Sequence, residues 1–464
     1  MAPDEQKLRK RLTVTPILSE NAEGNDDAAL VTRKTTKELK QNEVAIDGVV
    51  YDLTSFHHPG GGSIMIFGGN DVTVTYKMIH PYHTSKHLEK MTQVALLSDY
   101  KPEFKFDTPF EREIKQEVFK IVRRGREFGT PGYLFRAFLY VSLYFVTEAL
   151  WVTKGSSITL AIILGVAQAL IGLNVQHDAN HGAASKGPWL NDILGFGADL
   201  IGGSKWTWME QHWTHHSYTN HLEKDPDAIS AEPMIIFTDY PKGHAARKFY
   251  HRFQVLFLFP ILSFYWASSV FNPQILDLRQ RGALAAGIQM ENDFIVKRRK
   301  WAILIRLIYI FVNVVTPFLN HGLCWKAFGH IWVMSTVESL MLAVLFSLSH
   351  NFEHADRDPT QSVRQNGEPV CWFKSQVETS STYGGMISGM LTGGLNFQIE
   401  HHLFPRMCSS WYPYIAPTVR KVCKKHGVRY AYYPWILQNL ISTLKYMHQA
   451  GTGCNWENPY SGRA

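Results

Sequence analysis

Three clusters of histidines lie among apolar runs that are long enough to cross a membrane. The clusters read His177-Asp-Ala-Asn-His181, His212-Trp-Thr-His215-His216 and Gln398-Ile-Glu-His401-His402. Residues three and four positions apart share one face of a helix, so each cluster can direct two or three polar side chains at one point. Seven imidazoles exceed the four ligands that usually satisfy a zinc ion, whereas imidazole also suits iron. The clusters therefore predict two irons and oxygen chemistry on an apolar substrate.

The composition favours a membrane protein over a nucleic-acid-binding protein. Charged residues make up 19% of the 464 residues, and the formal net charge is only +7, which fits basic loops at a membrane surface. The five cysteines form no C-x-x-C pair, so neither a disulfide framework nor a thiolate metal site is indicated. Residues 1–32 lack the apolar core of a secretory signal and are expected to form a disordered tail.

The apolar runs predict four transmembrane helices. The runs are 133–153, 157–175, 253–271, 302–320 and 331–349. A spanning helix needs about 20 residues, and the run 253–271 is interrupted by Pro260 and several serines. If that run crossed the membrane, the third histidine cluster would lie on the opposite side from the first two and could not share their site. Basic residues concentrate on the histidine side, which places the histidines and both termini in the cytosol.

A short N-terminal unit contains a histidine on a tight turn. Residues 44–53 predict two short strands joined at Asp47-Gly48. Further on, His58 is followed by Pro59 and three glycines, and such a turn holds a histidine rigidly, as an axial heme ligand must be. An ordinary polar loop is the alternative interpretation of this motif taken alone.

Residues 33–105 resemble the heme-binding domain of cytochrome b5. The resemblance rests on the His-Pro-Gly-Gly turn, the stretch Asp71-Val-Thr73 and the second histidine, His80, which follows an aromatic residue at a spacing of four. It implies that His58 and His80 are the two heme ligands. His83 is the alternative for the second position.

Other side chains extend the candidate metal site. His350 ends the last apolar run and so lies at membrane depth, where an ionisable side chain is a functional candidate. His354, one turn further on, is the alternative. Polar residues that are expected to orient imidazoles through their second ring nitrogen are Asp178, Asn180, Asn220 and Asp225. Aromatic residues that are candidates either to line an acyl tunnel or to anchor the chain at the membrane interface are Trp206, Trp208, Trp213 and Phe397.

The three clusters behind a cytochrome b5-like unit resemble those of front-end fatty acyl desaturases. They have the patterns H-x-x-x-H, H-x-x-H-H and Q-x-x-H-H, in which Gln398 replaces a histidine. The segments QHDANHGA, QHWTHHSYTNH, GGLNFQIEHHLFPRM and AVLFSLSHNFE are most similar to the Δ5 desaturases of diatoms and related microalgae. The metal ligands that we predict are His177, His181, His212, His215, His216, His350, Gln398, His401 and His402. No catalytic residue beyond these ligands is predicted.

The resemblance implies an activity and a set of cofactors. Two ferrous non-heme irons and O2 are expected to insert a cis Δ5 double bond into twenty-carbon polyunsaturated acyl chains, giving arachidonate or eicosapentaenoate. Electrons are expected from NADH through cytochrome b5 reductase and the heme b of the fused domain. The acyl chain is expected on phospholipid or CoA. The alternatives are a Δ6, Δ8 or Δ4 front-end desaturase, a di-iron membrane hydroxylase and a membrane electron carrier with heme alone.

The predicted architecture is multi-domain. A disordered tail (1–32) precedes a small α+β cytochrome b5-like heme domain (33–105) and an amphipathic linker (106–132). An all-α membrane desaturase domain (133–445) follows, with four transmembrane helices and a cytosolic histidine-rich cap, and a C-terminal tail (446–464) ends the chain. We expect a multi-pass protein of the endoplasmic reticulum membrane that does not bind nucleic acid.

Overall fold

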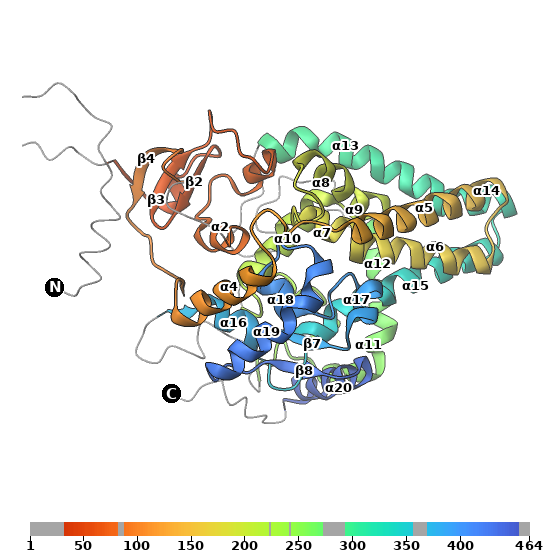
Figure 1. Ribbon diagram of the computed structural model, residues 1–464. Helices are drawn as coiled ribbons and strands as arrows, with labels where there is room; N and C mark the ends of the chain where they lie inside the picture. Colours follow the sequence, from red (N-terminus) through yellow and green to blue (C-terminus); the bar gives the residue numbers. More distant parts are fainter. Residues whose placement is uncertain are drawn as a thin grey trace, which may run out of the picture.

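The computed structural model describes residues 32–81, 88–221, 224–240, 243–271, 293–355 and 369–453. Within them the chain forms a small α+β unit and a larger helical unit, from which long helices project away from the α+β unit (Figure 1). This arrangement confirms the predicted fold class. The expected tail before residue 32 and the alternative heme ligand His83 lie outside the described residues.

The N-terminal unit is built on a four-stranded sheet with the strand order β1-β4-β3-β2. The strands are β1 (Arg33–Lys34), β2 (Glu43–Ile46), β3 (Val49–Asp52) and β4 (Thr92–Leu97). β2 and β3 pair antiparallel through Asp47 and Gly48, whose φ angles are 51° and 77°. Aspartate and glycine tolerate this left-handed backbone, so the predicted hairpin is confirmed. Short helices complete the unit: η1 (Thr36–Glu38), η2 (Gly62–Phe67) and α2 (Thr73–Ile79).

The predicted linker contains a helix that packs onto the C-terminal part of the chain. In α4 (Pro109–Ile121) the Thr108 hydroxyl caps the first turn by accepting from the Glu111 N–H. Phe110, Ile114 and Val118 recur at a spacing of four and are buried, so they form one apolar face. This face joins the core around α19 (Tyr412–Lys425). Next to it, β5 (Phe104–Lys105) pairs parallel with β6 (Val370–Cys371).

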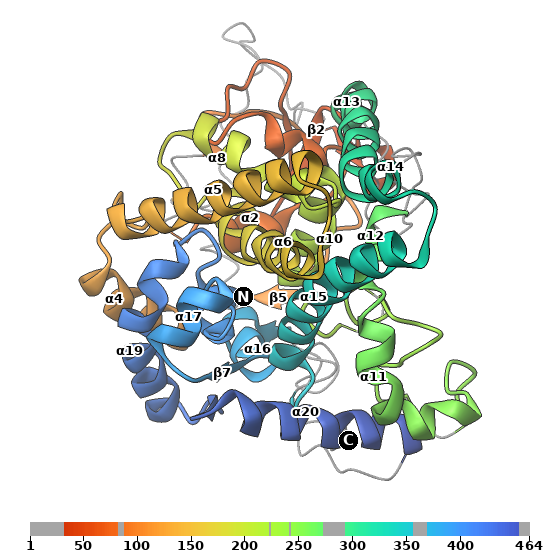
Figure 2. The same ribbon diagram turned by 90° about the vertical axis from the view of Figure 1, so that its right-hand side faces the viewer.

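Within the described residues, four helices are long and apolar enough to cross a membrane, as predicted. They are Pro131–Thr153 (α5), Ile158–Asn180 (α6, η3 and α7), Lys300–His321 (the end of α13 with η6 and α14) and Trp325–His350 (α15). Figure 2 looks toward their projecting ends. The apolar side chains of Phe135, Phe138 and Leu307 are exposed on their outer faces, as lipid-facing residues are in a bundle. The doubtful run forms shorter helices instead, α11 (Gln254–Leu262) and α12 (Tyr265–Val270).

Two of the four long helices contain a π-helical turn. In the second crossing, α6 (Ile158–Leu170) passes into the turn η3 (Ile171–Gln176) and then into α7 (His177–Asn180). The other turn is η6 (Phe311–Val315), between α13 (Asp293–Ile310) and α14 (Thr316–His321). A π-helical turn widens the helix by one residue and is frequent at functional sites. Here η3 ends immediately before His177, so its extra residue determines which side of the helix the first histidine cluster faces.

The histidine-rich cap is made of short helices at the base of the bundle (Figure 1). Between the second and third crossings these are α8 (Pro188–Gly195), α9 (Gly197–Leu200), α10 (Lys205–Ser217) and η4 (Phe249–Phe253). After the fourth crossing they are α16 (Trp372–Glu378), α17 (Met386–Thr392), α18 (Gln398–Leu403), η8 (Ser409–Trp411) and α20 (Ile436–Thr452). The strands β7 (Ser381–Tyr383) and β8 (Ala431–Tyr433) pair parallel within it. α20 continues past residue 445, and its buried Tyr446 and Met447 pack with α11.

Candidate metal centre and heme site

The predicted metal ligands come from four separate elements and meet at the base of the bundle. α7 and its C-terminal cap contribute the first cluster, α10 the second, the last residue of α15 contributes His350, and α18 the third cluster. All eight histidines and Gln398 are buried, with at most 9% of any residue exposed. The exposed His354 belongs to neither of the two histidine groups described next.

The first group comprises His177, His181, His212 and His401, which offer ring nitrogens within 4.8 Å of one another. The Nε2 atoms of His177 and His212 are 3.2 Å apart, and those of His212 and His216 are 3.1 Å apart. Two imidazole nitrogens that each lie about 2 Å from one metal ion are separated by such a distance. The group therefore has the geometry of a metal site.

The second group comprises His215, His350 and His402. The Nε2 atoms of His215 and His350 are 3.3 Å apart. The amide nitrogen of Gln398 lies 3.0 Å from Nε2 of His350 and 3.2 Å from Nε2 of His402, so the glutamine is part of this group. The His216 ring stacks on the His402 ring at 4.1 Å and thus lies between the two groups.

Partners outside the groups hold the other nitrogen, Nδ1, of several imidazoles. These contacts are His215 with Asp225 (3.0 Å), His350 with the Thr379 carbonyl (3.0 Å), His401 with the Tyr412 hydroxyl (3.0 Å) and His402 with the Gln376 side chain (2.8 Å). When Nδ1 donates its proton outward, Nε2 keeps its lone pair for a metal. Thr379, Tyr412 and Gln376 have no sequence signal, because their proximity to the histidines arises only from the packing of the cap.

The other polar residues that were expected to orient imidazoles have different partners. Asp178 accepts from the backbone N–H and the hydroxyl of Ser409. The Asn180 amide donates to Gln176. Asn220 acts indirectly, because its backbone N–H donates to Asp225, the partner of His215. Asp225 therefore hydrogen-bonds to an imidazole as expected, whereas the hydrogen bonds of Asp178 and Asn180 go to other neighbours. Asp178 lies 3.8 Å from Nδ1 of His177, beyond hydrogen-bond distance.

Burial keeps five of the imidazoles, all of them outside the membrane helices, in the neutral form that binds metal. Desolvation and the neighbouring imidazoles lower the pKa of five histidines far below its usual value: His181, His212, His216, His401 and His402. Their rings are neutral at pH 7 and keep a lone pair. Nε2 of His181, Nε2 of His401 and Oε1 of Gln398 are buried with no hydrogen-bond partner among the described residues. Buried polar atoms without a partner are costly, and a bound metal ion would satisfy them.

A pair of glycines brings the third cluster against the second membrane helix. Gly393 and Gly394 have φ angles of 65° and 83°. A Cβ atom on Gly393 would lie 1.9 Å from the carbonyl oxygen of Leu173, which belongs to η3. Only glycine permits this backbone-to-backbone contact. The chain that leads into the third cluster therefore lies directly on the turn that leads into the first.

In the N-terminal unit, His58 and His80 face one cavity. Their ring centroids are 6.1 Å apart, and the ring planes are at 89° to each other. The Gly60 N–H donates to Nδ1 of His58, whereas Nδ1 of His80 contacts the Tyr76 carbonyl at 2.8 Å. Apolar side chains of the unit line the same cavity, among them those of Val44, Ile46, Phe56, Ile64 and Val72. Two opposed imidazoles between apolar walls fit a heme with two axial histidines.

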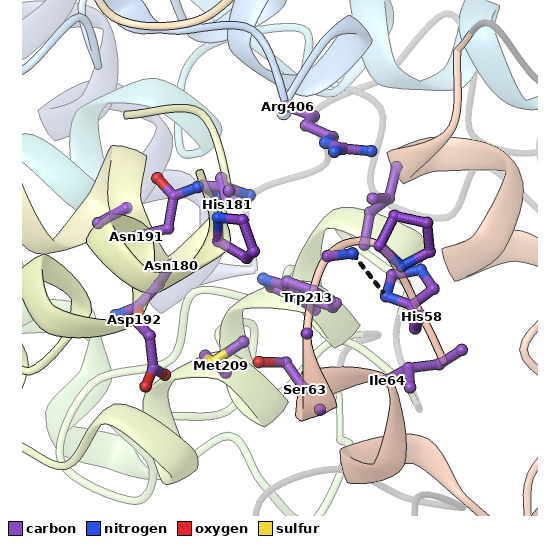
Figure 3. Close-up of a pocket in the computed structure, with 18 of the residues that line it drawn as sticks. His58, Ser63, Ile64, Asn180, His181, Asn191, Asp192, Met209, Trp213 and Arg406 are labelled. Carbon is purple, nitrogen blue, oxygen red and sulfur yellow. Dashed lines mark hydrogen bonds between the residues drawn. The ribbon is translucent and has the colours of Figure 1, made fainter. Parts of the chain in front are cut away.

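The cavity of about 1430 Å³ is shared by the two units (Figure 3). Its wall includes His181 and Arg406 from the helical unit as well as His58. The units touch where the Phe67 ring stacks on Trp213 at 5.8 Å. Helix α10 thus presents iron-ligand candidates on one side and a contact surface for the N-terminal unit on another.

The four aromatic residues that the sequence offers as tunnel or interface candidates lie close to the histidine groups or the N-terminal unit. Trp206 and Trp213 pack with the N-terminal unit, and Trp206 is buried. The Trp208 ring stacks on the His212 imidazole at 4.2 Å. Phe397 lies in the core that includes α4 and α19. Trp206 and Phe397, being buried, are not exposed anchors at the membrane interface.

Comparisons with known proteins agree with this geometry. A family model described as fatty acid desaturase matches residues 156–434, and one described as cytochrome b5-like heme/steroid binding domain matches residues 34–101. Acyl-lipid (7-3)-desaturases of Diacronema lutheri and Rebecca salina are 33% and 32% identical to the chain; both alignments cover 92% of this chain and 94% of the relative. Delta(5) fatty acid desaturase A of Dictyostelium discoideum is 26% identical, over 88% of this chain and 90% of its own length.

The two matched domains also identify the cofactors. A cytochrome b5-like domain implies heme, and the facing imidazoles of His58 and His80 fit it. A desaturase domain implies two non-heme irons, and the two buried histidine groups fit them. Since the desaturase model alone spans more than half of the chain, this protein belongs to the fatty acid desaturase family and joins an N-terminal cytochrome b5-like domain to a membrane desaturase domain.

Proposed function

We propose that this protein is a front-end acyl desaturase that inserts a cis Δ5 double bond into twenty-carbon polyunsaturated acyl chains. The observation that carries the proposal is the second metal group, in which Gln398 lies 3.0 Å from His350 and 3.2 Å from His402. A glutamine at this position is the mark of the front-end desaturases that the chain resembles. The Delta(5) desaturase of Dictyostelium discoideum supports the position of the double bond.

In this proposal the two histidine groups and Gln398 hold two irons, which supply the oxidising power when bound. The reaction removes two hydrogens from adjacent methylene groups, and O2, two electrons and two protons yield two waters. The protein's own part is to position groups and exclude water. Asp225, Thr379, Tyr412 and Gln376 fix the imidazole rings, and the buried site keeps bulk water from the reacting carbons.

We also propose the route of the electrons and the location of the enzyme. His58 and His80 would ligate heme b, which would be reduced by NADH-cytochrome b5 reductase. The shared cavity supports this route, because it joins the candidate heme site to His181 of the first histidine cluster. The excess of basic residues on the histidine side supports an endoplasmic reticulum protein with both termini in the cytosol. The acyl chain would be carried on phospholipid or CoA.

The relatives favour a second candidate, a front-end desaturase that places the double bond elsewhere, at Δ4, Δ6 or Δ8. The two most similar relatives described above are named acyl-lipid (7-3)-desaturases rather than Delta(5) desaturases. One methylene in an apolar pocket changes binding by only about 1–3 kcal/mol. A few side chains along the acyl path therefore suffice to separate the two candidates.

Feeding expressed protein with several acids distinguishes these activities. Yeast that makes the full chain would be supplied with polyunsaturated acids of eighteen, twenty and twenty-two carbons, and double-bond positions would be read by mass spectrometry. We expect a new Δ5 bond in twenty-carbon acids whose first double bond is at carbon 8. A new bond at another front-end position would replace the first candidate by the second. A hydroxylated chain would contradict both.

His58→Ala is expected to abolish the bis-imidazole heme spectrum and nearly all desaturation. The substitution removes one of the two imidazoles that face the cavity, so the irons lose their fused electron donor. His57→Ala is the matched control, because His57 is the preceding residue and is exposed. Spectra of the purified proteins and product yield in cells are measured together. Wild-type product from His58→Ala would show that the fused domain is not the required donor.

A further inference from the structure

The helical unit contributes a positively charged side chain to the heme cavity. Arg406 lies four residues after His402, just beyond the end of α18. It lines the same cavity as His58 and His80. Its Nε atom is 3.9 Å from the point where a Cβ on Gly182 would lie, next to His181. In Figure 3, Arg406 reaches from the desaturase domain into the space that His58 and His181 border.

Arg406 lacks a close anionic partner. Among the described residues, no carboxylate oxygen lies within 4 Å of its guanidinium group, and its ring contact is with Phe128, at 6.0 Å. Glu127 also lines the cavity and acts on Arg406 only from a greater distance. An arginine has five N–H donors in a planar fork that suits a carboxylate. A partly buried guanidinium without a carboxylate is therefore a site for an anion.

Heme b brings an anion of this kind, because its edge carries two propionate groups. We propose that Arg406 binds a heme propionate and thereby holds the heme domain in register with the third histidine cluster. This inference rests on the proposed ligation of heme by His58 and His80. It makes Arg406 a positioning residue, which joins the electron donor to the polypeptide segment that carries His401 and His402.

The charge of Arg406 has a second consequence for the heme. Ferrous heme carries one positive charge less than ferric heme, so a nearby cation favours the reduced form. Removal of that cation leaves the propionate uncompensated and favours the oxidised form. Replacing Arg406 by a neutral residue therefore lowers the reduction potential of the heme. For charges at a partly buried site, we expect the ratio of reduced to oxidised heme at a fixed potential to fall about fivefold.

The test compares three variants of the full-length protein loaded with heme and iron. Arg406→Gln removes the charge, and Arg406→Lys keeps it. Lys186→Gln is the matched control, because Lys186 is an exposed cation of the same domain that lines the same cavity. The readouts are the heme spectrum, the midpoint potential of the heme by spectroelectrochemistry and the rate of heme reoxidation after O2 and acyl substrate are added.

We expect Arg406→Gln to keep the bis-imidazole spectrum and to lower the midpoint potential. It should also slow reoxidation, because the loss of register between the heme domain and the third histidine cluster outweighs the larger driving force of a lower potential. Arg406→Lys should restore most of the potential, and Lys186→Gln should match the wild type. An unshifted potential in Arg406→Gln, with its heme spectrum intact, would overturn the role of Arg406 and leave the proposed heme site standing. A normal heme spectrum in His58→Ala would instead contradict the proposed heme site itself.

Discussion

His402→Ala is expected to remove most of the non-heme iron and to eliminate the desaturated product. His402 is fully buried, its ring stacks on His216, and its Nε2 atom faces Gln398. The substitution leaves the second group with His215 and His350 as its imidazoles. Wild-type protein should hold about two non-heme irons per chain besides the heme iron, since two groups of imidazoles suit two metals. Metal analysis of purified protein and product analysis in cells measure both effects.

His354→Asn serves as the control for this experiment. His354 is exposed and has a φ of 68°, a backbone conformation that asparagine tolerates better than alanine. It should keep wild-type iron content and activity, which also tests the alternative in which His354 is a ligand. Heme content should be unchanged in both variants. A wild-type protein with one zinc and no non-heme iron would rule out the di-iron interpretation.

Gln398→Ala is expected to lower turnover about 10–100-fold, the usual cost of losing a group that supports a metal site. The amide lies within 3.0–3.2 Å of two imidazole nitrogens, and its Oε1 is buried with no hydrogen-bond partner among the described residues. Rotation of the amide exchanges its oxygen and nitrogen, so the oxygen can face a metal bound by His350 and His402. We predict that Gln398 acts as a weak oxygen ligand or binds a water on the metal.

Gln398→His separates this role from simple packing. An imidazole is a stronger ligand than an amide, so the variant should keep its iron but lose most of its turnover. Protein level and heme content should match the wild type in both variants. Wild-type turnover in Gln398→Ala would show that the glutamine only fills a polar position in α18.

Local sequence patterns predicted those parts of the fold that depend on near neighbours. The Asp47-Gly48 hairpin was predictable because the turn needs residues that accept a positive φ. The four membrane helices were predictable from the length and polarity of the apolar runs. The run 253–271 was excluded because all three histidine clusters had to lie on the same side of the membrane. The spacing within each cluster predicted that its side chains share one face of a helix. The structure brings these side chains together, whereas their role as ligands stays a prediction.

Features that depend on distant packing were not predictable. No pattern marks the π-helical turn η3, because the preceding helix α6 is apolar on nearly every side, so a shift of its buried face leaves almost no trace in the sequence. Thr379, Tyr412 and Gln376 reach the imidazoles only after the cap has folded. The packing of Trp206 and Trp213 against the N-terminal domain was also not predictable, because the sequence does not show which face of α10 that domain covers.

The contact of Gly393 with Leu173 has a consequence for how enzymes of this type can diverge. The segments that carry the first and third clusters meet here through backbone atoms alone, because Gly393 has no side chain. Backbone atoms are the same whatever the side chains elsewhere in the sequence. Changes of side chain elsewhere along the acyl path can therefore alter how deeply a chain enters without displacing the oxidising centre. In the proposed mechanism the bound irons would keep a fixed position, and the distance from them to the end of the acyl path would decide which bond is oxidised.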